Sequence, residues 1–401
     1  GDAFPGGQWF AWWEQPKNPT KPWKKHLLAA NEPGATNIMP TDFNGDGHVD
    51  YFATRGHGQG VLWFKGPKFV QIEIDPKILF PHSLDLADLD NDGDIDYAVG
   101  NVGLNTKYHA DPGHPVILYY GDYGDEGVKR LVEAKYENDV IVPARGKSCS
   151  TKAMPHLSKK FGTFHQFASA TLPQIYTSEC LSESVKLEAN TLESGIFIND
   201  GKGSFSFRPL PSTAQSSAIF GLEFVEVDGD GKLDLYAVQN FSNPQFETPP
   251  FRGGLSVLLR GDGKGGFTMV SHSESGLVVP TDGRALACSD LNGDGRPDFL
   301  VGINNGELLA FTNRRTPSAG VLRLQGGGGN PSVAGARVTL VSKDGTRVQE
   351  VYQGGGYLSQ STPAIFLDSG VTRVEVVWPD GSSSSHPVDP ATRETVISVP
   401  E

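Results

Sequence analysis

Short apolar runs alternate with turns rich in glycine and acidic residues along most of the chain. The runs are rich in Val, Leu, Phe, Tyr and Trp, as in 60–66 (GVLWFKG) and 195–199 (GIFIN). Gly and Pro supply 49 and 28 of the 401 residues, and they fall mainly between these runs. Short β-prone runs separated by turn residues are typical of many strands joined by tight turns. The pattern therefore predicts an all-β protein.

One polar segment recurs four times between the apolar runs. It has the form D-x-[DN]-x-D-G-x-x-D, with Glu at position one of the third copy, and it spans 42–50, 88–96, 226–234 and 290–298. Ca²⁺ takes about six to eight oxygens, and alternate side chains of a curled loop converge on one point. The glycine at position six permits the positive φ that bends such a loop. Four copies that share carboxylates as well as glycines favour metal sites over ordinary Asp-Gly hairpin turns.

The predicted metal ligands stand at positions one, three, five, seven and nine of each loop. They are Asp42, Asn44, Asp46, His48, Asp50, Asp88, Asp90, Asp92, Asp94, Asp96, Glu226, Asp228, Asp230, Lys232, Asp234, Asp290, Asn292, Asp294, Arg296 and Asp298. Position seven varies freely because only its backbone carbonyl would be needed. We expect about four Ca²⁺ ions, because Mg²⁺ retains its waters and rarely takes all-protein ligand sets.

The residues around the loops place them on strands. An EF-hand needs Glu at position twelve and a helix on each side, whereas position twelve is Ala or Val in all four loops. Short β-type runs such as 51–53 follow each loop. The loop starts are 46, 138 and 64 residues apart, and 138 is three times 46. A period in the forties is typical of a four-stranded propeller blade, so we predict a calcium-binding β-propeller of five to seven blades.

Two segments depart from this period. Residues 140–192 carry apolar positions at mixed three- and four-residue spacing with few β-branched residues, which predicts a helical insertion. Residues 8–28 carry strands without a preceding loop, and the unit that starts at 290 lacks a clear outer pair. We expect these two partial blades to complete one another through contact between 8–28 and 306–313, because propellers usually close by joining their ends.

Charge and composition narrow the class of partner. The formal charge is −13, and no basic patch suited to a nucleic-acid backbone is evident in the sequence. No apolar run is long enough to span a bilayer. The chain starts at Gly1, which we interpret as a mature chain whose secretory signal was removed. Cys149, Cys180 and Cys288 show no CxxC spacing. The sequence favours a disulfide between Cys149 and Cys180 no more than it favours three free thiols.

The loops and their flanking strands resemble the FG-GAP/VCBS repeat family, although the literal Phe-Gly occurs only in places such as 220–221. Further along, 326–331 (GGGGNP), 354–361 (GGGYLSQS) and 374–381 (VEVVWPDG) resemble the ASPIC/UnbV domain of cartilage acidic protein-like bacterial proteins. The resemblance implies a propeller over 1–315, with the insertion at about 140–192, and a second domain over 318–401. Alternation in 337–341 and 373–378 predicts that this domain is a small β-sandwich.

Three functions remain open on the sequence alone. The family resemblance implies a secreted or cell-surface protein that binds calcium and acts in extracellular binding or adhesion, with a protein, a carbohydrate or a second copy as partner. A subunit of an extracellular filament or surface layer is an alternative. A carbohydrate-active enzyme of the lyase or dehydratase type is another, although the sequence shows no ordered catalytic motif and we assign no catalytic residue. Its candidate ligand site lies where equivalent strands end, at Arg55, Asn101, Gln239, Asn240, Asn304 and Asn305.

Overall fold

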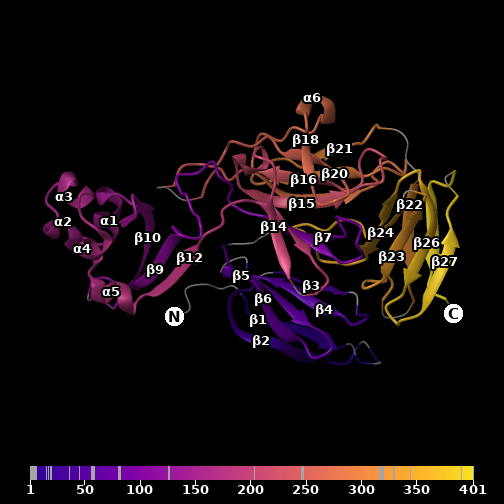
Figure 1. Ribbon diagram of the computed structural model, residues 1–401, viewed down its shortest axis with the longest axis horizontal. Helices are drawn as coiled ribbons and strands as arrows, with labels where there is room; N and C mark the ends of the chain where they lie inside the picture. The colour runs from indigo at the N-terminus through magenta and orange to yellow at the C-terminus, as the bar shows by residue number, and fades with distance from the viewer. Residues whose placement is uncertain are drawn as a thin grey trace.

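The computed structural model describes residues 7–400 except 15, 17, 19, 36, 45, 56–58, 80–82, 125–126, 203, 245–247, 316–319, 328–329, 344 and 390. Strands dominate these residues and form eight sheets (Figure 1). The prediction of an all-β chain is therefore confirmed.

Four antiparallel sheets carry one acidic loop each, always between their first and second strands. The first sheet contains β3 (Asn37–Thr41), β4 (Asp50–Thr54), β5 (Gln59–Lys65) and β6 (Val70–Leu79), and the second contains β7 (Ser83–Ala87), β8 (Asp96–Gly100), β13 (Gly195–Asn199) and β14 (Phe205–Pro209). The third contains β15 (Ile219–Val225), β16 (Asp234–Gln239), β17 (Val257–Gly261) and β18 (Phe267–Val270), and the fourth contains β19 (Gly283–Ser289), β20 (Asp298–Ile303) and β21 (Leu309–Phe311). The prediction that the loops lie between strands is confirmed.

Consecutive sheets pack against each other through shared apolar cores. Phe52 and Trp63 of the first sheet form one core with Tyr97 of the second. Leu235 and Leu259 of the third sheet belong to a core shared with the second. Strands covered on both faces become continuously apolar, and β8 and β16 are buried along their whole length. The first three loop-bearing sheets therefore pack against one another in chain order.

The long gap between the second and third loops is an insertion within one sheet. β8 pairs directly with β13, and the chain between them forms a separate sheet. That sheet contains β9 (Val116–Asp122), β10 (Lys129–Glu137), β11 (Val140–Pro143) and β12 (Val185–Ala189). The 138-residue spacing is therefore not three blades, and the predicted count of five to seven blades is not confirmed by the four loop-bearing sheets of the described residues.

Five short helices cover one face of the inserted sheet, so the predicted helical insertion is confirmed over a narrower range. They are α1 (Lys147–Ala153), α2 (His156–Lys160), α3 (Phe164–Ala168), α4 (Leu172–Tyr176) and α5 (Ser178–Glu183). Thr163 and Thr171 begin α3 and α4 with capping boxes, which satisfy free N–H groups of the first turn. Leu172 and Ile175 recur at helical spacing and pack against Tyr119 of β9.

The N-terminal hairpin does not complete the fourth sheet. β1 (Gly7–Glu14) pairs with β2 (Lys24–Ala35), and in the described residues this pair forms its own two-stranded sheet. Phe10 packs on Phe64 of the first sheet, with 5.8 Å between ring centroids. Figure 1 shows the hairpin and β21 on opposite sides of the molecule. The predicted contact between residues 8–28 and 306–313 is wrong, because the apolar face of the hairpin finds its partner in the neighbouring sheet.

The C-terminal residues form a sandwich of two sheets around one core. One sheet contains β22 (Gly320–Gln325), β25 (Ile365–Leu367) and β28 (Glu394–Ser398), and the other contains β23 (Arg337–Ser342), β24 (Gly345–Glu350), β26 (Val371–Val377) and β27 (Ser383–Pro387). β22 and β28 run parallel, and the other pairs are antiparallel. Trp378 lies in the core with 1% of its surface exposed, and its Nε1 donates to Ser384 Oγ.

The segment after β24 runs between the first strands of the loop-bearing sheets. The Tyr352 hydroxyl donates to Asp85 of β7, and Ser361 Oγ accepts the N–H of Cys288 in β19 at 2.9 Å. A cavity of about 110 Å³ lies between these strands and the segment, lined in part by Asp85, Glu223 and Tyr352. The segment after β24 thus contacts the first strands of the second and fourth loop-bearing sheets.

Among the described residues, two short helical elements lie outside the insertion. A 3₁₀ turn spans Ala214–Ser216, and α6 spans His272–Ser275. No helix in the described part of the chain is long and apolar enough to cross a membrane. Cys149 and Cys180 are not joined by a disulfide.

Candidate metal sites

The glycine at position six bends each loop through a left-handed backbone conformation. Gly47, Gly93, Gly231 and Gly295 have φ of 83°, 96°, 82° and 83°. A Cβ added at Gly47 or Gly93 would meet no atom within 4 Å, so the requirement is conformational and not one of space. The positive φ predicted for this position is confirmed.

The carboxylate at position five closes a turn inside each loop. Its Oδ1 accepts the backbone N–H of position seven at 3.0, 3.0, 2.9 and 3.1 Å in the four loops, in chain order. An aspartate that accepts an N–H two residues on forms an Asx turn, which fixes the local curvature. Lys232 and Arg296 at position seven approach the position-five carboxylates of their own loops at 3.4 and 3.3 Å.

The acidic residue at position one accepts backbone N–H groups from the middle of its loop. Asp42 Oδ1 and Oδ2 accept from Asp46 at 3.1 Å and from Gly47 at 2.9 Å. Asp290 makes the corresponding contacts in the fourth loop. Glu226 Oε1 reaches the N–H groups of positions three, four and five with its longer side chain. The first, third and fourth loops are therefore curled around the position-one carboxylate.

The aspartate at position nine joins its loop to the third strand of the sheet. One oxygen accepts the N–H of position two at 3.1, 2.9, 3.2 and 2.9 Å in the four loops. The other accepts an N–H at or just beyond the end of the third strand, from Gly66, Asn199, Gly261 and Asn313, at 2.6, 2.8, 3.0 and 2.7 Å. These aspartates are at most 2% exposed. Sequence reasoning treated position nine only as a metal ligand and missed this structural role.

Several loop oxygens are buried without a hydrogen-bond partner. In the described residues they include the Oδ1 atoms of Asn44, Asp88, Asp90 and Asp228. Asn44, Asp90 and Asp228 are the position-three residues of the first three loops. A buried oxygen that lacks a donor costs free energy unless something else satisfies it. A cation bound inside the loop would supply that partner, so these residues fit a metal.

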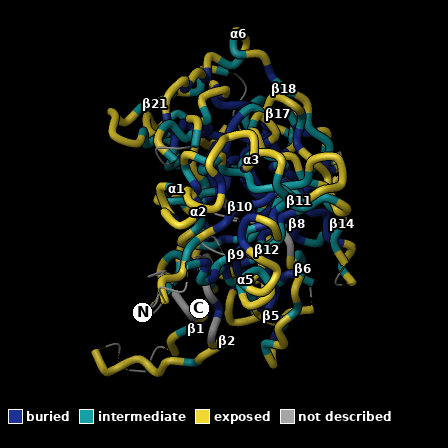
Figure 2. The backbone as a smooth tube through the Cα atoms, turned by 90° about the vertical axis from the view of Figure 1, so that its left-hand side faces the viewer, coloured by how far each residue is buried: buried dark blue, intermediate teal, exposed yellow. Residues whose placement is uncertain are grey.

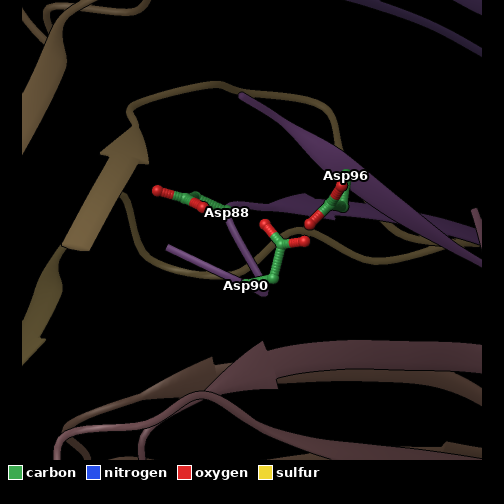
Figure 3. Close-up of side chains that lie close together, drawn as sticks. All are labelled: Asp88, Asp90 and Asp96. Atoms are coloured by element: carbon green, nitrogen blue, oxygen red, sulfur yellow. The ribbon is translucent and has the colours of Figure 1, made fainter. Parts of the chain in front are cut away.

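Two loops bring three carboxylates together. Oxygens of Asp88, Asp90 and Asp96 lie within 4.8 Å of one another, and Figure 3 shows the three side chains gathered at the start of β8. Glu226, Asp228 and Asp234 form the equivalent cluster of the third loop. The first and fourth loops have Asn at position three, which offers a neutral oxygen instead. Hard oxygen ligands at this density suit Ca²⁺.

Without a cation these carboxylates are costly to ionise. Burial raises the pKa of Asp96 to about 8 and the pKa of Asp234 to about 7. Burial also raises the pKa of Glu226 to about 7, and burial together with the charge of Asp92 raises that of Asp88 to about 6. A divalent ion would oppose both causes, because it replaces lost hydration and offsets like-charge repulsion.

The C-terminal sandwich contacts three of the four loops through two arginines. Arg337 of β23 donates from Nη2 to the carbonyl of Gly93 and from Nη1 to the carbonyl of Asp42 at 3.4 Å. Arg347 of β24 donates from Nη1 to the carbonyl of Gly231 at 3.3 Å. Gly93 and Gly231 are the position-six residues of their loops. The C-terminal domain therefore docks on backbone carbonyls of these loops.

Acidic residues of the sandwich accompany these arginines. Glu350 Oε1 is 3.2 Å from Arg337 Nη1, and its Oε2 accepts the Asp42 N–H at 3.3 Å. Asp368 Oδ2 is 3.9 Å from Arg347 Nη2. Breaking a buried ion pair by removing one partner costs about 3–5 kcal/mol, because the remaining charge loses its compensation.

Replacing both arginines, as Arg337→Ala with Arg347→Ala, is expected to release the sandwich from the loops. The radius of gyration measured by small-angle X-ray scattering should rise, because three guanidinium contacts to the loops are lost and Glu350 and Asp368 keep uncompensated charges. Arg373→Ala is the matched control, since Arg373 is half exposed and pairs with Glu375 of its own strand. Scattering curves of the double variant that superimpose on those of the parent chain would contradict the proposed docking role.

The six residues of the candidate ligand site end or follow the second strands, at the opposite end of each strand from the loops. Asn101 donates to the carbonyls of Thr191 and Glu193 at 3.1 and 3.4 Å. Asn240 Nδ2 donates to the Gly254 carbonyl at 2.9 Å, and Gln239 Nε2 donates to the Ala214 carbonyl at 3.1 Å. These contacts use the side chains to satisfy backbone groups.

The remaining members of that set differ in their surroundings. Arg55 contacts Glu32 at 2.6 Å and Glu73 at 2.8 Å. Asn304 and Asn305 are exposed. The six side chains therefore do not share one environment, and their assignment to a ligand stays a prediction.

Comparisons with known proteins agree with the repeat and the C-terminal domain. Residues 6–99 match the family model described as FG-GAP-like repeat, and residues 326–401 match the model described as ASPIC and UnbV. The chain therefore contains an N-terminal segment that matches FG-GAP-like repeats and a C-terminal segment that matches ASPIC and UnbV. A comparison with curated proteins finds no match.

Among solved structures, the chain is similar to the biofilm matrix protein Bap1 of V. cholerae. The sequence identity is 10%, the TM-score is 0.21, and the match covers 92% of this chain and 50% of that chain. This chain thus spans about half the length of that protein. A likeness at this TM-score carries no argument about fold or function.

Proposed function

We propose that this chain is an extracellular calcium-binding module for binding or adhesion, in which Ca²⁺ ions hold the four acidic loops. The observation that supports it best is the set of buried, unpartnered oxygens at position three of three loops, repeated in the same backbone setting. Ordinary acidic turns give no reason for an unpartnered buried oxygen to recur at the same position of several loops. The proposal also rests on the FG-GAP and ASPIC/UnbV matches, whose families the sequence resemblance associates with extracellular binding.

The residues at positions one, three, five and nine would hold the ion with side-chain oxygens, and position seven would add its carbonyl. The ion would supply positive charge and would join the loop segments that these side chains come from. Four divalent ions would change the formal charge from −13 to −5 and would reduce repulsion among the loop carboxylates. A rigid loop would in turn present a fixed surface to Arg337 and Arg347 of the C-terminal domain.

Calcium binding is tested by equilibrium dialysis of the full chain followed by elemental analysis. We expect about four Ca²⁺ ions per chain at millimolar calcium, and one fewer for Asp90→Ala, because the second loop loses its position-three oxygen. Glu137→Ala, an exposed carboxylate on β10 that pairs with Lys135, is the control and should leave the count unchanged. Absence of bound calcium, or equal binding of Mg²⁺, would refute the metal assignment.

The adhesion part of the proposal has its own test. Fluorescently labelled chain is applied to arrays of extracellular proteins and polysaccharides in calcium and again in EGTA. Retention that requires calcium supports a calcium-dependent binding module. Retention on no surface, together with turnover of a polysaccharide on the array, would favour the enzyme alternative instead.

A further inference from the structure

The N-terminal hairpin exposes an unusual group of large side chains. Trp9, Trp13 and Trp23 are 41%, 45% and 48% exposed, and Leu27 is 56% exposed. Figure 2 shows the hairpin at the lower edge of the molecule, with exposed residues along much of it. Exposed tryptophans that cluster on one element mark binding surfaces more often than scattered apolar residues do.

Trp9, Trp13 and Leu27 share the outer face of the hairpin. Trp13 lies opposite Lys25, and Ala11 lies opposite Leu27, so these residues and Trp9 point to the same side of the two strands. Phe10 points to the other side, where it packs against the first sheet. The hairpin is therefore anchored by its inner face, while Trp9, Trp13 and Leu27 on its outer face are 41–56% exposed.

Two indole rings and a lysine form the centre of this outer face. The centroids of Trp9 and Trp13 are 5.7 Å apart with 62° between their planes. Lys25 Nζ lies 3.2 Å from the centroid of Trp9 and 5.7 Å from that of Trp13. A cation held against two rings keeps them in place and presents apolar and positive groups together.

The hairpin is positive in a chain that is strongly negative. Between residues 8 and 28 the sequence holds Lys17, Lys21, Lys24 and Lys25 against the single acid Glu14, whereas the whole chain carries −13. Glu14 already contacts His26 at 2.8 Å and Lys24 at 3.8 Å. A negatively charged partner would therefore be attracted to this face and repelled by the rest of the molecule.

We propose that the outer face of the β1–β2 hairpin binds an anionic polysaccharide. The flat indole faces suit the C–H faces of sugar rings, and the lysines suit carboxylate or sulfate groups along the same polymer. The inference rests on the proposed function and deepens it, since it names the class of extracellular partner and the surface that takes it. It requires no bound calcium at the hairpin, because the acidic loops lie outside the hairpin residues.

Two other occupants fit the hairpin less well. A lipid surface would be entered by an apolar turn, but the connection between the strands, 15–23, reads QPKNPTKPW, in which Trp23, next to β2, is the single large apolar residue. A second copy of the chain, docked face to face, would place the same lysines against each other, which is unfavourable. Both occupants are distinguishable from a polysaccharide in the test below.

The test measures binding of the full chain to immobilised chondroitin sulfate by biolayer interferometry. Neutral dextran and phosphatidylglycerol vesicles are the comparison surfaces. Trp9→Ala with Trp13→Ala is expected to weaken binding to chondroitin sulfate by about tenfold or more, because exposed aromatic anchors dominate such contacts. Lys24→Gln with Lys25→Gln should also weaken binding and should flatten its salt dependence.

Phe164→Ala is the matched control, because Phe164 is 66% exposed and has Lys147 Nζ 5.2 Å from its ring centroid, far along the chain from the hairpin. It should bind like the parent chain. Circular dichroism checks the fold, and if the tryptophan variant is misfolded the lysine variant provides the result. Unchanged binding of the hairpin variants, tighter binding to vesicles, or a hairpin-dependent dimer in sedimentation would overturn the proposal.

Calcium content is measured on the same samples, so that the two proposals can fail separately. Binding to chondroitin sulfate without any bound calcium would contradict the metal assignment alone. Full calcium binding with no attachment to chondroitin sulfate, in the parent chain as in the variants, would contradict the hairpin proposal alone.

Discussion

Removal of calcium is expected to lower the melting temperature of this protein by more than any single substitution on its surface. The reason is the group of buried carboxylates in the loops, among them Asp96 and Asp234, whose pKa values are raised by burial. An ion that binds only the folded chain adds about 2.7 kcal/mol per site when free calcium exceeds its Kd a hundredfold. Differential scanning calorimetry in millimolar calcium and in EGTA measures the difference.

The control for this experiment exchanges calcium for magnesium at the same ionic strength. Because Mg²⁺ keeps its waters and demands a tighter octahedron, it should restore less of the melting temperature than Ca²⁺ does. Ionic strength alone should restore little, since the carboxylates of Asp50, Asp96 and Asp298 are fully buried and weakly screened. A melt that is the same in calcium and in EGTA would leave the four loops as structural turns without a metal.

The calcium effect should also depend on pH in a defined direction. A carboxyl whose folded pKa is raised above its unfolded value stabilises the protein at low pH, and that stability is lost as pH rises through the folded pKa. The metal-free chain should therefore lose stability between about pH 4 and pH 8, the range set by Asp88, Glu226, Asp234 and Asp96. The gain from calcium should grow over the same range.

The sequence was sufficient for features that are set within one loop. Positive φ at position six follows from four glycines at the same place in a polar segment, and the flanking strands follow from the β-type runs beside it. These features depend on residues fewer than ten apart, so they do not depend on how distant parts of the chain pair. The helices of the insertion were predictable for the same reason.

Features that depend on distant pairing were not predictable from spacing. The gap of 138 residues between two loops matched three blades in length, but β8 pairs with β13 across the whole insertion. Period alone does not distinguish three repeats from one repeat interrupted by another fold. The predicted contact of the N-terminal hairpin with 306–313 was wrong for a related reason. An antiparallel strand with an apolar face can pack on several sheets, and Phe10 packs on Phe64 of the first sheet.

The aspartate at position nine, a predicted metal ligand that also accepts backbone hydrogen bonds, was only partly predictable. The sequence shows an aspartate at position nine of each loop, where the second strand of each loop-bearing sheet begins. Its repetition indicates that this position requires a carboxylate. Its backbone partners on the third strand were not visible, because in the second sheet the insertion separates Asp96 from Asn199. The repeated spacing of the predicted ligands therefore concealed a structural hydrogen bond that the same carboxylate makes.

Asp96→Ala is expected to destabilise the chain by about 2–6 kcal/mol with or without calcium. Asp96 is fully buried and accepts the N–H groups of Leu89 at 2.9 Å and Asn199 at 2.8 Å. Its removal leaves two buried donors without partners, each at a cost of about 1–3 kcal/mol. Urea titrations followed by tryptophan fluorescence, in calcium and in EGTA, measure the loss.

Asp90→Ala in the same loop separates the structural role from the ligand role. Asp90 Oδ1 has no hydrogen-bond partner in the described residues, and its ionised form is opposed by burial and by the charge of Asp92. Its removal should leave the metal-free chain as stable as the parent and should reduce only the gain from calcium. Asp96→Asn should recover part of the loss, because the amide retains one acceptor oxygen while its NH₂ faces an N–H donor. Equal losses for Asp90→Ala and Asp96→Ala in EGTA would mean that both carboxylates are structural, and the distinction between position three and position nine would then have no basis.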